Sequence, residues 1–189
     1  MIIFRRNFLG DFQMKAFQHF KTITAHRHMV IRHCKKAGIF RQGLRHDLSK
    51  YSPIEFLAGA RYYQGDKSPN EMERKIYGYS ASWLHHKGRN RHHFEYWTDY
   101  SHETKELIPI KMPVNYVAEM FCDRVAASKI YQGKNYTQHH PLEYFLRAKG
   151  KRFIHPETSD LLEKWLRILD EDGEEAAFAE IRKALKEKN

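Results

Sequence analysis

Apolar residues recur at helical spacing along most of this chain, and that spacing limits its fold more than any other feature. Between residues 12 and 37 successive apolar positions are three, four or seven residues apart, at Phe12, Ala16, Phe20, Ile23, Val30, Cys34 and Ala37. Such intervals place the side chains on one face of an α-helix. Gly38 follows directly, and glycine is common just past the end of a helix. The pattern therefore predicts a long helix that ends at Ala37.

The rest of the chain gives the same kind of signal, and alternating strand patterns are essentially absent. The segments SPIE (52–55) and SPNE (68–71) read as helix starts, with serine as the N-cap, proline in the first turn and glutamate reaching back to the cap. The remaining predicted helices cover residues 43–50, 69–86, 113–131, 141–148, 159–169 and 174–188. We expect an all-α, single-domain bundle of six to eight helices.

Length and charge set the expected organisation. The 189 residues suit one domain. Met14-Lys15 resembles a start, so residues 1–13 are treated as an N-terminal extension and 14–156 as the helical core. Residues 157–189 carry a net charge of −4 and are expected to pack on that core or on a partner subunit, which leaves a homodimer open. The whole chain carries +10, so residues 1–156 carry +14.

Composition narrows the partners and the compartment. A strongly basic body attracts phosphate-bearing partners, either small molecules or nucleic acid. No apolar run is long enough to cross a bilayer, so no membrane association is expected. The two cysteines are far apart and form no Cys-x-x-Cys motif. We therefore expect a cytoplasmic protein with neither a disulfide framework nor a cysteine zinc site.

Histidine is unusually frequent, with 13 residues, and one of them lies on the apolar stripe of the first helix. His26 falls between Ile23 and Val30, so its ring is expected to face the core. A buried histidine satisfied by one hydrogen bond is the simpler interpretation. His28 and His33 are alternative candidates on the same helix.

The dipeptide His46-Asp47 supplies further candidate ligands. Taken alone it is a weak signal, because adjacent residues on a helix diverge by about 100°. Lys50 lies about one turn further on, where its ammonium could reach a bound phosphate. The alternative for Lys50 is a solvated charge.

Residues 83–97, WLHHKGRNRHHFEYW, combine histidines with basic and aromatic side chains. His86 continues the stripe of Ile76 and Tyr79 on the predicted helix 69–86 and should face inward with them, whereas His85 should lie on the surface. His92 and His93 come after Gly88 and Asn90, which bend or end the helix, so one or both could fold back beside His86. Imidazole suits iron, manganese, nickel, cobalt or zinc. The competing interpretation is a basic aromatic face that binds nucleic acid.

Asp123 lies inside an apolar helical segment, EMFCDRVAAS. A carboxylate among such neighbours is costly unless it is paired or binds a metal. The order His26, His46-Asp47, His86, His92 or His93, Asp123 resembles the H…HD…D pattern of the HD-domain metal-dependent phosphohydrolases. The phrases GLRHDLSKYSPIEF, RNRHHFEYW and MPVNYVAEMFCD resemble more closely a small bacterial family without established function.

The HD-domain resemblance implies an HD-like helical fold that holds one or two divalent transition-metal ions. The implied ligands are His26, His46, Asp47, His86, His92 and Asp123. The expected reaction is hydrolysis of a phosphomonoester or phosphodiester, with a nucleotide as the favoured substrate. A hydroxide on the metal would attack phosphorus, Asp47 and Lys50 would be catalytic, and Asp47 would bridge if two ions bind. Lys50, Arg45, Arg89, Arg91 and His93 are the candidates to bind the phosphate.

Two other functions compete with this enzyme. One is a basic helical protein that binds nucleic acid, for which binding weakens steeply as salt rises. The other is a catalytically silent member of the fold, in which a metal only holds helices together. The enzyme binds metal, whereas the nucleic-acid-binding protein does not. The enzyme turns over a phosphoester, whereas the catalytically silent protein binds metal without turnover.

Overall fold

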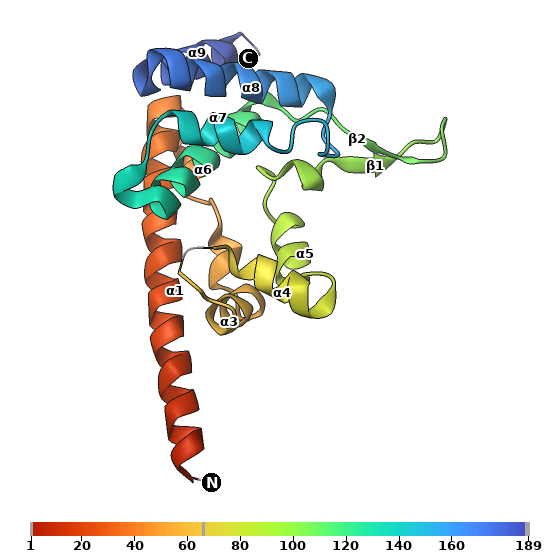
Figure 1. The fold of residues 1–189 in the computed structure, drawn as a ribbon. Helices are drawn as coiled ribbons and strands as arrows, with labels where there is room; N and C mark the ends of the chain where they lie inside the picture. Colours follow the sequence, from red (N-terminus) through yellow and green to blue (C-terminus); the bar gives the residue numbers. More distant parts are fainter. Residues whose placement is uncertain (1, 66, 188–189) are drawn as a thin grey trace. The chain divides into compact units, whose positions relative to one another are not determined.

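The computed structural model describes residues 2–65 and 67–187, and it confirms the all-α prediction (Figure 1). The described residues form nine α-helices, three short 3-10 helices and one two-stranded sheet. By its contacts the chain divides into two compact units, residues 1–28 with 47–90 and residues 29–46 with 91–189. Each unit combines two separate segments, so no single cut along the sequence separates them.

The first unit is built around α3 (Pro53–Arg61), which contacts η1 (Leu48–Tyr51), α4 (Pro69–Tyr77) and α5 (Ala81–Lys87). The part of α1 (Ile2–Ala37) up to His28 also belongs to it. Its buried side chains are mostly polar or charged, namely His19, His26, Asp47, Glu55, Glu73, Ser80, Ser82, His86 and Asn90. Buried polar groups need partners, so this unit is organised by hydrogen bonds and ion pairs as much as by apolar contact.

The second unit holds the large apolar core. Its central helix, α6 (Val114–Gln132), packs against α7 (His139–Leu146), α8 (Pro156–Asp172) and α9 (Glu174–Lys186). Phe121 of α6 meets Trp165 of α8 and Phe178 of α9 edge to face, at ring-centroid distances of 6.4 and 5.8 Å. All three rings are fully buried. The acidic C-terminal helices are therefore part of this core, and Lys188 and Asn189 lie outside the described residues.

Smaller elements complete the second unit. They are α2 (Phe40–Gly43), η2 (Phe94–Tyr96), η3 (Gly133–Asn135), and an antiparallel ribbon of β1 (Thr98–Tyr100) and β2 (Leu107–Pro109). The ribbon was not expected from the sequence. Its strands have three residues each, which is too few to display an alternating pattern.

The predicted helix 69–86 is wrong as a single element. Gly78 adopts a left-handed conformation with φ 80° and ends α4, and Ser80 then caps α5 through Trp83 N. Ile76 and Tyr79, which were expected on an inward stripe, are 52% and 59% exposed. The break at glycine adds one helix to the expected number, giving nine among the described residues.

Ser52 and Ser68 do precede α3 and α4, but neither side chain caps its helix. Proline follows each serine at the start of the helix, and the Glu55 carboxylate binds His85 instead of the cap. The predicted helix starts are thus correct, whereas the predicted capping boxes are wrong.

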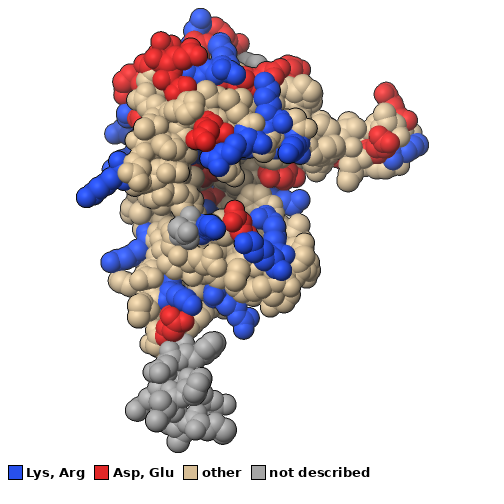
Figure 2. All heavy atoms as spheres, in the orientation of Figure 1, with Lys and Arg blue, Asp and Glu red and all other residues tan. Residues whose placement is uncertain are grey.

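The described helices include none with enough length and apolar character to span a bilayer. On the face drawn in Figure 2, lysine and arginine side chains are scattered over the surface with acidic residues among them. The basic net charge does not gather there into one continuous patch.

Candidate metal-binding residues

His46 and Asp47 lie in a turn between α2 and η1, not on the predicted helix 43–50. Asp47 has a left-handed backbone, with φ 53°. Aspartate tolerates this conformation better than most residues with a side chain. The helical conformation is therefore broken at the dipeptide itself, and both residues are about 1% exposed.

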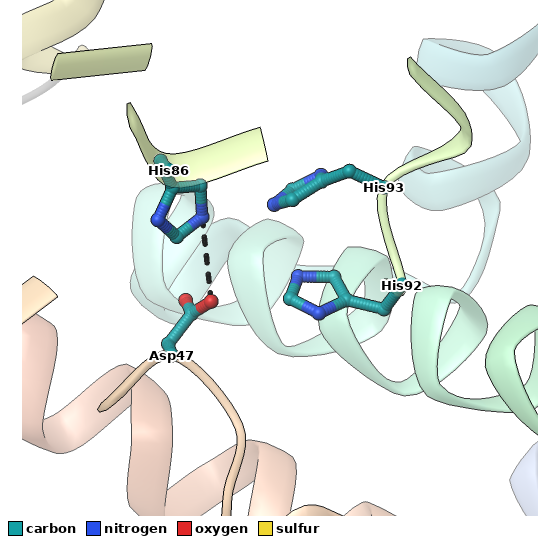
Figure 3. Close-up of side chains that lie close together, drawn as sticks. All are labelled: Asp47, His86, His92 and His93. Atoms are coloured by element: carbon teal, nitrogen blue, oxygen red, sulfur yellow. Dashed lines mark ion pairs between the residues drawn. The ribbon is translucent and has the colours of Figure 1, made fainter. Parts of the chain in front are cut away.

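In the first unit, Asp47 lies among three basic side chains, and together they form the Asp47 cluster. Nε2 of His86 lies 3.3 Å from Oδ1 of Asp47 (Figure 3), and Nε2 of His26 lies 4.0 Å from Oδ2. Lys50 Nζ forms an ion pair with Oδ2 at 2.6 Å. Each carboxylate oxygen thus faces one imidazole Nε2, in an environment nearly free of solvent.

The other side of His86 is held by a second carboxylate. Nδ1 of His86 donates to Glu55 Oε2 at 2.7 Å, and Nδ1 of His85 donates to Oε1 of the same group at 2.6 Å. Burial disfavours the ionised form of Glu55, but the hydrogen bonds from His86 and His85 outweigh it and lower its pKa. With its Nδ1–H donated to Glu55, a neutral His86 imidazole presents its Nε2 lone pair to Asp47.

The second unit contains an equivalent arrangement, the His46 cluster. Nδ1 of His46 donates to Glu119 Oε1 at 2.9 Å, and Nε2 of His46 lies 3.4 Å from Asp123 Oδ1. Nδ1 of His92 is 3.3 Å from Glu119 Oε1, and the His46 and His92 rings are 4.4 Å apart. His46, His92 and Glu119 each offer a ligand atom within 4.8 Å of the others.

Glu119 is the electrostatic centre of the His46 cluster. Burial alone would raise the pKa of this carboxyl, but hydrogen bonds from His46 and His92 lower it to about 2. Gln42 Nε2 donates to its second oxygen at 2.6 Å. Glu119 is therefore ionised, and it fixes the orientation of His46 as Glu55 fixes that of His86.

One histidine–aspartate distance in each cluster fits a shared divalent ion. Ligand atoms that share an ion at 2.0–2.2 Å are about 3.0–3.4 Å apart for octahedral to tetrahedral angles. The separations of 3.3 Å for His86–Asp47 and 3.4 Å for His46–Asp123 match that spacing. Imidazole with carboxylate is also the ligand mixture that transition metals accept.

The alternative histidines on α1 have other surroundings. His28 is exposed. His33 is buried in the second unit, where its Nδ1 lies 3.3 Å from the carbonyl oxygen of Cys122 and its Nε2 lies 3.5 Å from Lys129 Nζ. Both ring nitrogens of His33 thus have protein partners, and His26 is the one with a contact to Asp47.

The surroundings of His33 predict an effect of pH on stability. Burial, and then the nearby Lys129 ammonium, lower the pKa of His33 to about 4 from 6.5. The unfolded chain takes up this proton first, so the free energy of unfolding should fall between pH 6.5 and 4, by up to about 3 kcal/mol from this residue. Urea unfolding across that range should show a shallower decline for His33→Gln. The exposed His28→Gln is the control, and equal declines for both variants would contradict the assignment.

The predicted phosphate-binding residues differ in exposure and partners. Arg45 is exposed, and Arg89 is exposed and donates to the carbonyl of His85 at 3.3 Å. Arg91 is exposed beside two tyrosines. His93 is half-buried, and its ring centroid is 4.0 Å from that of His92 (Figure 3).

Sequence reasoning missed the two orienting glutamates, Glu55 and Glu119. Glu119 lies one turn before Asp123 in the same apolar helix, so the argument from burial cost applies to it equally. The spacing of Glu55 from Ser52 predicts a cap, not a contact with histidine. His85, expected on the surface, is half-buried because Glu55 binds it.

A helical protein with buried histidine–carboxylate clusters is the class that the fold and these contacts define. The chain belongs to a family of unknown function, DUF5662, whose model matches residues 15–168. No curated protein and no solved structure matches the chain. The family gives no activity, so a function has to come from the two clusters themselves.

Proposed function

We propose that this protein is a metal-dependent phosphohydrolase of the HD-domain type. In the first unit His26, Asp47 and His86 would hold a divalent ion. In the second, His46, His92 and Asp123 would do so. Iron, manganese, nickel, cobalt and zinc all suit these donors, and one or both clusters would be loaded.

One observation carries the proposal: in both clusters a histidine donates Nδ1–H to a buried glutamate while its Nε2 faces an aspartate oxygen. A neutral imidazole of that tautomer places a lone pair against a carboxylate at 3.3–3.4 Å. Two such groups repel unless a cation lies between them. A metal supplies that cation, and carboxylate–histidine–metal arrangements are a recurrent way to hold one.

A simple buried ion pair is the competing explanation, with each imidazole doubly protonated. That arrangement would bury imidazolium ions and carboxylates together, and desolvation makes such pairs poor sources of stability. The same pattern occurs in two separate clusters. Metal binding by both explains this repetition better than two buried ion pairs that each lose stability through desolvation.

A bound divalent ion would supply Lewis acidity and an acidified water for attack on phosphorus. The chain's own residues would provide the remaining functions. Lys50, fixed by Asp47, holds a positive charge at the edge of the cluster and would bind a phosphate oxygen. The basic net charge of +10 would attract an anionic phosphoester, with a nucleotide as the favoured substrate.

Metal content and turnover test this function together. The purified protein is expected to carry at least about one transition-metal ion per chain and to hydrolyse p-nitrophenyl phosphate or bis(p-nitrophenyl) phosphate. Removal of the ion with a chelator should reduce hydrolysis to the rate of the buffer, and the original metal should restore it. Metal without turnover on any phosphoester would indicate a purely structural ion, and absence of metal even after reconstitution would exclude both interpretations.

A further inference from the structure

Arg91 is a basic residue of the second unit that lies among aromatic side chains. It directly precedes His92 and His93, and its side chain is exposed. Its guanidinium carbon lies 5.7 Å from the ring centroid of Tyr96, and Nη1 donates to the hydroxyl of Tyr116 at 3.4 Å.

The backbone of Arg91 is fixed as well. The indole N–H of Trp97 donates to the carbonyl oxygen of Arg91 at 2.7 Å. Trp97 in turn contacts Tyr96 and Tyr116, at ring-centroid distances of 5.4 and 5.6 Å. Three aromatic side chains therefore hold both ends of one arginine, which limits the freedom that an exposed arginine normally has.

The partners of Arg91 are all neutral. Among the described residues no carboxylate forms an ion pair with it, whereas Arg147, next to the end of α7, and Arg167 on α8 pair with glutamates. Tyrosine hydroxyls occupy only part of the five N–H donors of a guanidinium. Arg91 thus keeps its full charge and a set of donors in a fixed orientation, which is the requirement for binding a phosphate in a bidentate manner.

Tyr116 links this arginine to the His46 cluster. Tyr116 and Glu119 are three residues apart on α6, so their side chains leave the helix on the same face. Glu119 binds His92, and Arg91 is the preceding residue in the chain. The same short segment and the same helix face therefore position the candidate ligands and the arginine.

We propose that Arg91, held by Tyr96, Trp97 and Tyr116, is a subsite that binds the phosphate group of a small phosphorylated substrate. Its identity as a substrate subsite rests on the proposed function, but its capacity to bind phosphate does not. Arg89 is less suited to this role, because its Nη1 donates to the carbonyl oxygen of His85 at the end of α5. The aromatic residues are positioning residues, since they act through Arg91.

Calorimetric titration of the purified protein tests the subsite, with inorganic phosphate and AMP as probes. Arg91→Ala should weaken binding of both probes about tenfold or more, because charged hydrogen bonds are lost. Arg91→Lys should restore only part of the affinity, since an ammonium cannot form the bidentate contact. Tyr116→Phe, which removes only a hydroxyl, should weaken binding less than Arg91→Ala. Arg147→Ala, next to the end of α7, is the matched control and should bind like the wild type.

The results of these measurements distinguish the Arg91 phosphate subsite from the phosphohydrolase function. Unchanged affinity in Arg91→Ala, with metal content and hydrolysis intact, would overturn the subsite and leave the hydrolase standing. Phosphate binding that depends on Arg91 in a protein with no metal and no turnover would support the subsite and overturn the hydrolase. Binding of a single-stranded oligonucleotide that depends on Arg91, with no binding of phosphate or AMP, would overturn the small-molecule subsite in favour of nucleic acid.

Discussion

Replacing Asp47 by asparagine should remove the metal bound by the Asp47 cluster and bring phosphoester hydrolysis down to the rate of the buffer. His26, His86 and Lys50 are all directed at the Asp47 carboxylate. Without its charge these basic side chains face a neutral amide, and a divalent ion loses its carboxylate ligand. Elemental analysis of the wild type and the variant, purified side by side, measures the loss directly.

Asparagine is a sharper substitution than alanine at this position. The φ of 53° at residue 47 strains alanine, whereas asparagine adopts left-handed backbone readily and keeps the shape of the side chain. A loss of metal in Asp47→Asn then reports the charge and not a distorted turn. Asp160→Asn, on the exposed face of α8, is the control and should retain metal and activity. Full metal content in Asp47→Asn would remove Asp47 from the ligands and with it the argument for the first cluster.

Helix positions were predictable where local signals and tertiary packing agree. The helix predicted from Pro113 is α6, because proline fixes its start and an apolar sequence fills the core behind it. The long first helix ends at Ala37, where Gly38 takes φ 85°. Pro113 marks the start of α6 and Gly38 marks the end of α1. Each of these residues also adopts the backbone conformation that its boundary requires.

Predictions failed where one residue could serve two purposes. Glu55 fits the third position of a capping box, yet its carboxylate binds His85 and His86. A cap is a local contact that sequence spacing can suggest, whereas a partner about thirty residues away depends on how α5 packs against α3. The apolar spacing continues across Gly78 and therefore predicts one helix, and only the left-handed backbone of Gly78 shows the break.

The candidate site divides in the same way. His26, His86 and Asp123 could be predicted from the sequence because each is a polar residue at a position where the helical spacing expects an apolar one. Glu119 was missed, although its side chain is more deeply buried than that of Asp123, because glutamate is usually a surface residue of helices. Which atom of a histidine faces which carboxylate cannot be read from sequence, and the proposed function depends on that detail.

Glu119→Gln should weaken metal binding by about 10- to 100-fold and also destabilise the fold. Glutamine keeps the size of Glu119 but removes the charge that orients His46 and His92, and loss of an orienting carboxylate typically has an effect of that size on affinity. Breaking a buried charge pair typically costs about 3–5 kcal/mol of the free energy of unfolding. Titration of the metal-free protein with metal, and urea unfolding at neutral pH, give the two quantities separately.

The separation of these two effects decides what Glu119 does. Glu180→Gln, which breaks the more exposed ion pair with Lys164, is the control and should cost no more than about 1 kcal/mol and leave metal binding unchanged. If Glu119→Gln lowers stability while the folded variant binds metal with wild-type affinity, Glu119 is a buried counter-charge and nothing more. If affinity falls while the protein is still fully folded at neutral pH, Glu119 acts through His46 on the ion. Only the second result is expected from a histidine whose Nε2 has been turned toward Asp123 to hold a metal.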